Sequence, residues 1–247
     1  MRELPIPFNT EMVRAILDGR KTRTMRPVKP QPSLMSSIVK LCYEKHPFSP
    51  SAFVGTPAEG RIGGEDRMGW LAEDWCGNII GTAGADEFKP PFGLPGDRLY
   101  VRETWAVADR LSDYEPCVVY GADGATRQAW SEEIAEWMAE QEVNHGADWR
   151  PSIHMPKRAA RIWLEVENVT VMRVRDITEE QALAEGAPKA PGRGAYPSSR
   201  AARVMEHRAG FINLWDAIYA PQGLAWDANP WCWSCSFRVL STTGRPA

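Results

Sequence analysis

The chain has 247 residues and a net charge of −3, and its length suits one large domain or two small ones. Hydrophobic residues make up 43% and charged residues 25%, which is enough for a globular core. The slight acidity excludes a protein that coats nucleic acid through an overall positive charge, so such a contact requires a local basic patch. We find no apolar run that predicts a membrane span and no apolar leader that predicts secretion. Five cysteines without the spacing of a disulfide framework favour the reducing cytoplasm.

The first predicted element is a short helix over residues 8–19. Asn9 or Thr10 can cap its start, and Gly19 is placed to end it in a left-handed conformation. The following segment is rich in proline, glycine and serine, which predicts an insertion at about 31–92 that holds one hairpin.

The second half of the chain shows clearer alternation. We predict strands over 98–102, 162–166 and 231–240, and helices over 131–142, 178–186 and 201–219. A second insertion is predicted at about 107–150. Because regular βαβ alternation is missing, the pattern favours a single α+β domain over 1–247, with a barrel-like sheet, flanking helices and two large insertions.

One basic segment stands out after the first predicted helix. No acidic residue occurs between Asp18 and Glu44, and the stretch from Arg20 to Lys29 holds five cations: Arg20, Lys21, Arg23, Arg26 and Lys29. A cationic loop that follows a helix can bind phosphate or polarise a carbonyl group. The alternative is an ordinary solvated basic loop.

The segment Gly19–Arg26 resembles the signature of the ASCH family, glycine-x-lysine-x-x-glutamate/threonine-x-arginine. Two further stretches resemble later landmarks of that family, Gly96–Val101 and Asp176–Thr178 with its helix. The longer resemblance is to ASCH proteins of bacteriophages and prophages, which carry similar stretches to Gly96–Trp105, Ser152–Pro156 and Asn229–Trp233. It implies a PUA-like β-barrel in the cytoplasm of a bacterial host cell.

The resemblance also implies an activity. Small bacterial members are amidohydrolases that remove the acetyl group from N4-acetylcytidine with a lysine, a threonine and a glutamate. Lys21 and Thr24 match the first two, and Glu185 matches the third when the helices are aligned at Thr178. Glu179 and Glu180 lie on the same helix and stay open as alternatives. This chemistry needs no cofactor.

The chemistry of these three residues is coherent. A threonine hydroxyl is a weak nucleophile that needs a neighbouring base, and Thr24 acts either as that nucleophile or by orienting water. Lys21 can be the base if burial or a second cation lowers its pKa. Glu185 lies near the C-terminal end of its helix, where the dipole disfavours negative charge, which suits a proton relay. For each residue the alternative is a structural role.

A second hypothesis is a non-catalytic protein that binds RNA or modified DNA. It uses a second basic cluster beside a histidine, and a tryptophan that stacks on a base. The candidate ligand-binding residues are Arg23, Arg26, Trp105, His154, Lys157 and Arg158. A third hypothesis is a metal-free ribonuclease that uses Lys21, His154 and Glu185. The alternatives are a core tryptophan, a structural histidine, and an ion pair from Arg26 to Asp97 or Glu103.

The sequence predicts no metal site. Cys232 and Cys235 have the CxxC spacing, but they fall in a predicted strand and no second close pair accompanies them. Residues three apart in a strand point to opposite faces, which is poor geometry for one zinc ion or for a disulfide.

Overall fold

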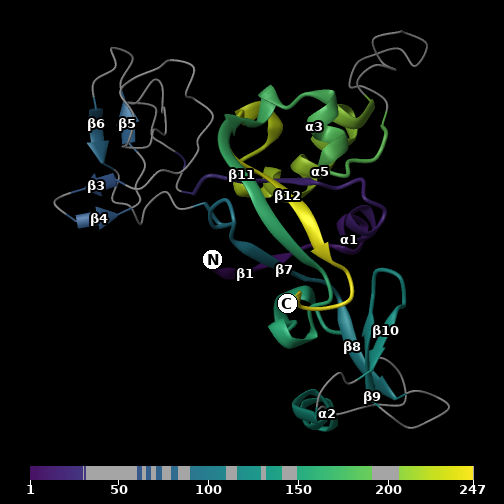
Figure 1. Cartoon of the computed structure of the whole chain (residues 1–247). Helices are drawn as coiled ribbons and strands as arrows, with labels where there is room; N and C mark the ends of the chain where they lie inside the picture. Colours follow the sequence, from purple (N-terminus) through teal and green to yellow (C-terminus); the bar gives the residue numbers. More distant parts are fainter. Residues whose placement is uncertain are drawn as a thin grey trace. The chain divides into compact units, whose positions relative to one another are not determined.

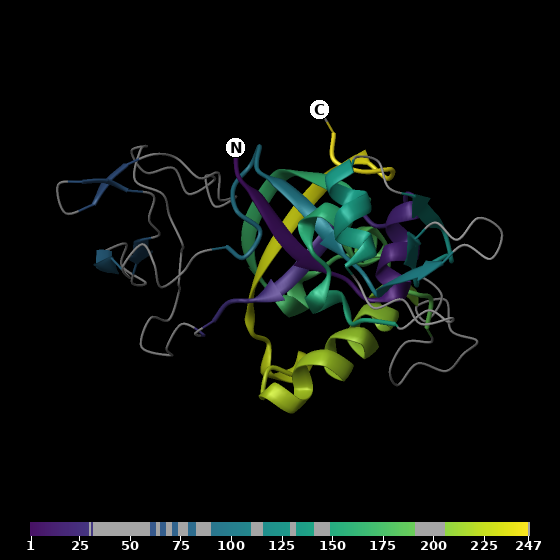
Figure 2. The same ribbon diagram turned by 90° about the horizontal axis from the view of Figure 1, so that it is seen from below.

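The computed structural model (Figures 1 and 2) describes residues 1–29, 31, 90–109, 116–128, 132–140, 149–190 and 206–246. It also describes the backbone of two short hairpins within the predicted first insertion, with strands β3 (Gly60–Ile62), β4 (Glu65–Arg67), β5 (Leu71–Glu73) and β6 (Ile79–Thr82). The chain forms two compact units. Unit 1 holds Met1–Arg20, Arg98–Glu165 and Val239–Ala247; unit 2 holds Lys21–Asp97 and Val166–Arg238.

The main sheet has five strands, in the order β1-β7-β11-β12-β2. Their bounds are β1 Glu3–Pro7, β7 Arg98–Arg102, β11 Trp163–Arg173, β12 Trp231–Ser241 and β2 Arg23–Pro27. The β1–β7 pair is parallel, and β7–β11 and β12–β2 are antiparallel. The predicted α+β class is therefore confirmed. Among the described residues β1 and β2 are edges, and no barrel closes.

Strand β2 explains how the basic segment is held. Its register with β12 pairs Thr24 with Cys235 and Pro27 with Cys232. Phe237 donates its backbone N–H to the carbonyl oxygen of Thr22, so Thr22 and Phe237 are a hydrogen-bonded pair of the two strands. Hydrogen-bonded and non-hydrogen-bonded pairs alternate along an antiparallel ladder, which makes Pro27 and Cys232 a non-hydrogen-bonded pair. The sheet therefore needs no N–H group from Pro27, as is usual for a proline in an edge strand.

Two helices of unit 2, α3 and α5, pack together (Figure 1), and α3 contacts β2. Helix α3 (Glu179–Ala184) starts with the predicted capping box at Thr178 and ends at Glu185, which is its C-cap. Helix α5 (Glu206–Tyr219) starts where the Glu179 carboxylate accepts the first backbone N–H groups, at 2.7 and 2.8 Å. The part of the predicted helix 201–219 that precedes 206 lies outside the described residues.

The core of unit 2 fills the space between β2 and these helices. It comprises Met25, Val174, Ile177, Ala182, Ala187, Phe211, Ile212, Trp215, Tyr219, Trp226 and Cys232. A Cβ atom at Gly210 in α5 would collide with the carbonyl group of Pro188. The glycine therefore permits a close approach between α5 and the chain that follows α3.

Unit 1 holds helix α1 (Thr10–Leu17), which Asn9 caps by accepting the N–H of Met12 at 2.9 Å.

The predicted second insertion contains more than the expected helix. Strands β8 (Trp105–Asp109), β9 (Pro116–Tyr120) and β10 (Thr126–Gln128) form an antiparallel sheet, and α2 (Glu132–Ala139) packs against it. None of the helices in the described ranges is long and apolar enough to cross a lipid bilayer.

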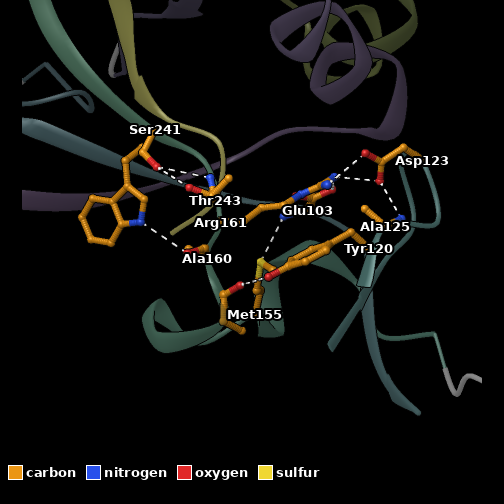
Figure 3. A network of polar contacts seen from close by, with 11 residues as sticks. Glu103, Tyr120, Asp123, Ala125, Met155, Ala160, Arg161, Ser241 and Thr243 are labelled. Atoms are coloured by element: carbon orange, nitrogen blue, oxygen red, sulfur yellow. Dashed lines mark hydrogen bonds and ion pairs between the residues drawn. The ribbon is translucent and has the colours of Figure 1, made fainter. Parts of the chain in front are cut away.

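A buried polar network stabilises unit 1 (Figure 3). The Arg161 guanidinium lies between two carboxylates, with two bonds of 2.9 Å to Glu103 and bonds of 2.9 and 3.0 Å to Asp123. It also lies 4.2 Å from the Tyr120 ring centroid. Burial raises the pKa of Glu103, and the bonds to Arg161 oppose that shift. Both oxygens of Glu103 are satisfied, so this network is structural.

Candidate functional site

Lys21 occupies the junction between a turn and strand β2. Gly19 takes the predicted left-handed conformation at φ 71°, which turns the chain out of α1. The neighbouring Thr22 donates its backbone N–H to the Ala184 carbonyl oxygen at 2.8 Å and accepts from Phe237 at 2.9 Å. The start of β2 is thereby tied to the end of α3 and to β12.

The Lys21 ammonium group forms a buried ion pair with Glu185. Nζ lies 2.7 Å from each of three acceptors: Glu185 Oε2, the Glu185 carbonyl oxygen and the Arg23 carbonyl oxygen. Lys21 has no exposed surface, and Glu185 is 5% exposed. An ammonium group has three donors and no acceptor, so this geometry fits the charged form.

The electrostatics of this pair are those of a buried site. Burial lowers the pKa of Lys21, the Glu185 carboxylate opposes the shift, and the Arg26 guanidinium adds to it. Burial also lowers the pKa of Arg23, and the negative charge of Glu185 opposes this shift as well. Strongly perturbed groups in one cluster are a feature of functional sites, although structural ion pairs share it.

Thr24 directly follows Arg23, whose carbonyl oxygen accepts a hydrogen bond from Lys21. Its side chain is fully buried, and its Oγ1 has no hydrogen-bond partner within the described part of the chain. The same holds for Oε1 of Glu185. Buried polar atoms are nearly always hydrogen-bonded, so these two oxygens, one of them on the buried ion pair, need an explanation.

The structure separates the three glutamates of the predicted helix. Glu185 contacts Lys21 directly. Glu179 uses both carboxylate oxygens to cap helix α5. Glu180 is exposed. Of these three, Glu185 alone is in position to act with Lys21.

The two arginines of the segment lie at the partly exposed rim of β2. Arg23 donates from Nε to Ser234 Oγ at 2.6 Å. Arg26 donates to the carbonyl oxygen of Met25 at 3.3 Å. Of the two carboxylates that are alternative partners for Arg26, Glu103 binds Arg161 with both of its oxygens. Arg26 shares the Thr24 face of β2, because residues two apart in a strand do so.

The other candidate ligand-binding residues belong to unit 1. Trp105 is 2% exposed and packs against Trp137, with ring centroids 5.9 Å apart, so no face of it is free for a nucleobase. His154 is exposed at the end of a short 3-10 helix, Ser152–His154. Lys157 pairs with Glu3, and Arg158 pairs with Glu133 at 3.8 Å.

Two residues with a potential role were missed by sequence reasoning. Cys235 was weighed as a metal ligand, but its register places it opposite Thr24. Trp149 was not singled out, yet it is 48% exposed. The position of Cys235 depends on which strand pairs with β12, and no local signal separates Trp149 from the other tryptophans.

The two cysteines of the CxxC pair lie apart, as strand geometry predicts. Cys232 packs in the Met25 core, and Cys235 faces the Thr24 side. Burial raises the pKa of both thiols, that of Cys235 to about 12. The described residues bring together no group of three or more side chains that could hold a metal ion.

Comparisons with known proteins add no relative. No family model matches the chain, and neither the curated proteins nor the solved structures give a match. The site is therefore interpreted from its own residues.

Proposed function

We propose that the chain is an amidohydrolase that removes an acyl group from the exocyclic nitrogen of a cytidine-type base, on a PUA-like fold of the ASCH type. One observation carries the proposal. The two buried oxygens without partners, Thr24 Oγ1 and Glu185 Oε1, belong to residues that the family signature assigns to catalysis. Lys21, the third residue of that set, binds Glu185 at 2.7 Å.

The proposed reaction uses the unbonded oxygens for attack and proton transfer. Thr24 Oγ1 attacks the acyl carbon, and its proton passes to Glu185 Oε1. The bond between the acyl carbon and the base nitrogen breaks, and Glu185 returns the proton to that nitrogen. Water then hydrolyses the acyl-threonine ester, giving its proton to Glu185 and then to Thr24, and the carboxylic acid leaves.

Lys21 takes a different role from the one that the family signature implies. Its three donors are committed to three acceptors, so its charged form holds Glu185 and the Arg23–Thr24 peptide in place. Arg26, on the Thr24 face, is assigned to the carbonyl oxygen of the ligand. Because Lys21 and Thr24 have no exposed surface, the proposal requires surrounding side chains to move before the substrate enters.

Thr24→Val is the direct test of this function. Valine has nearly the same shape without the hydroxyl, so hydrolysis of N4-acetylcytidine is expected to fall by at least about 100-fold. Stability is expected to hold or to rise by about 1 kcal/mol, because a buried hydroxyl without a partner is replaced by a methyl group. Chromatography of the released cytidine and chemical denaturation measure the two effects.

The matched control is Thr22→Val, two residues earlier on the exposed side of the chain. It is expected to keep wild-type turnover. Pure, folded wild-type protein without turnover of any N4-acylated cytidine would contradict the proposed function. Full activity in Thr24→Val would contradict the role of Thr24.

A second function, binding of single-stranded RNA, is favoured by a separate surface in unit 1. Trp149 precedes His154 by five residues in the sequence, and both side chains are exposed. The side chains of Lys157 and Arg158, which come next, are each 43% exposed. An accessible aromatic ring with cations close by in sequence suits base stacking with phosphate contacts.

Trp149→Ala is expected to weaken RNA binding about tenfold, since stacking on one base contributes about 1–3 kcal/mol. Fluorescence anisotropy of a labelled single-stranded RNA at several salt concentrations measures this effect, and Lys157→Ala is expected to lower the salt slope by about one. Ile218→Ala, an exposed apolar residue of α5 in unit 2, is the control. Equal affinity of wild type and Trp149→Ala would exclude this surface.

A further inference from the structure

Cys235 is the side chain that the sheet register sets directly opposite Thr24. The two residues pair across β12 and β2, and both are fully buried. Directly paired residues in an antiparallel sheet share a face, with Cα atoms about 5.5 Å apart at hydrogen-bonded positions. The Thr24 hydroxyl therefore has the Cys235 thiol as its cross-strand neighbour.

Independent observations place Cys235 beside the rest of the site. The charges of Glu185 and Lys21 both act on its thiol. Its Sγ donates a weak hydrogen bond of 3.6 Å to the Ser236 carbonyl oxygen. Thr24 Oγ1 and Glu185 Oε1 are buried without a hydrogen-bond partner among the described residues, so both oxygens can still accept a hydrogen bond.

The thiol itself is not equipped to react. Burial raises its pKa to about 12, so it stays neutral at physiological pH, and the thiolate is the nucleophilic form. A neutral buried cysteine behaves as a small apolar side chain. What Cys235 contributes is therefore volume next to Thr24.

We propose that Cys235 determines the length of acyl chain that the site accepts, by forming the wall that the acyl group meets when its carbonyl carbon reaches Thr24 Oγ1. This inference rests on the proposed amidohydrolase function. A site with a cysteine at this position favours the short acetyl group over longer chains.

The test compares kcat/KM for N4-acetylcytidine and N4-butyrylcytidine. Cys235→Ala is expected to raise the butyryl-to-acetyl ratio about tenfold, and Cys235→Val to lower it, because one methylene group in an apolar pocket changes specificity by roughly 10- to 200-fold. Cys235→Ser keeps the volume and is expected to keep the wild-type ratio.

Cys232→Ala is the matched control. Cys232 is also a fully buried cysteine of β12, but it packs in the Met25 core on the other face. Its replacement creates a comparable cavity and is expected to leave the ratio unchanged. An unchanged ratio in Cys235→Ala, with wild-type turnover intact, would overturn this inference alone. Absence of turnover in the wild type would overturn the amidohydrolase function and the inference with it.

Discussion

Lys21→Met is expected to abolish deacylation and to lower the free energy of unfolding by about 3–5 kcal/mol, because it leaves the Glu185 charge buried without its partner. The ion pair has a 2.7 Å separation, with 0% and 5% of the two side chains exposed. Chemical denaturation and product chromatography measure both losses in one preparation. Lys189→Met is the control, since the Lys189 side chain is 69% exposed where it pairs with Glu206 at 3.2 Å and such surface pairs contribute less than about 1 kcal/mol.

The double variant Lys21→Met, Glu185→Leu separates structure from catalysis. It removes both charges and fills the site with apolar atoms, so stability is expected to return to the wild-type level or above it. Activity is expected to stay absent, because no proton acceptor remains. A stable double variant that still hydrolyses the substrate would reduce the pair to a structural role.

Local signals account for the parts of the fold that the sequence predicts well. The capping box at Thr178 predicts α3, and the helix aligned there ends at Glu185, the residue that meets Lys21. The alternation of 231–240 predicts β12. Gly19 ends the first helix in the left-handed conformation as expected. Each of these features depends on residues within one or two turns of chain.

Features that depend on distant contacts could not be predicted. The backbone N–H groups of His207 and Arg208 in α5 donate to the carboxylate of Glu179, which belongs to another element. The sheet β8–β9–β10 lies in a segment that the sequence identifies only as an insertion, because its strands are three to five residues long. Short strands carry little periodic signal, and their pairing is decided by packing.

The site shows the same division between local and distant information. The family signature identifies Lys21 and Thr24, but it does not reveal that both are fully buried. Trp105 and Trp149 are the same residue type, and packing against Trp137 decides that the first is buried. The register that sets Cys235 opposite Thr24 requires knowing which strands are neighbours.

The pH dependence of deacylation is expected to reveal which form of Lys21 the reaction uses. Burial lowers the pKa of Lys21 below its ordinary value of 10.5. The proposed mechanism needs the charged ammonium group to hold Glu185, so kcat/KM is expected to fall about tenfold per pH unit above that lowered pKa. The hypothesis of a neutral Lys21 base predicts a rise over the same window. A pH profile between neutrality and 10.5 decides between them by its sign.

The titration of Lys21 does not itself destabilise the fold in that window, as its linkage shows. Because its pKa is lower in the folded than in the unfolded chain, the unfolded chain binds more protons between the two values, and this contribution to stability rises with pH. The thiols of Cys232 and Cys235 have raised pKa values and act in the opposite sense above their ordinary value of 9. Between neutrality and pH 9 these thiols stay protonated, so the difference between the denaturation profiles of wild type and Lys21→Met in that range reports on Lys21. A difference that grows in favour of wild type as pH rises, while its activity falls, identifies the charged lysine as part of the catalytic machinery.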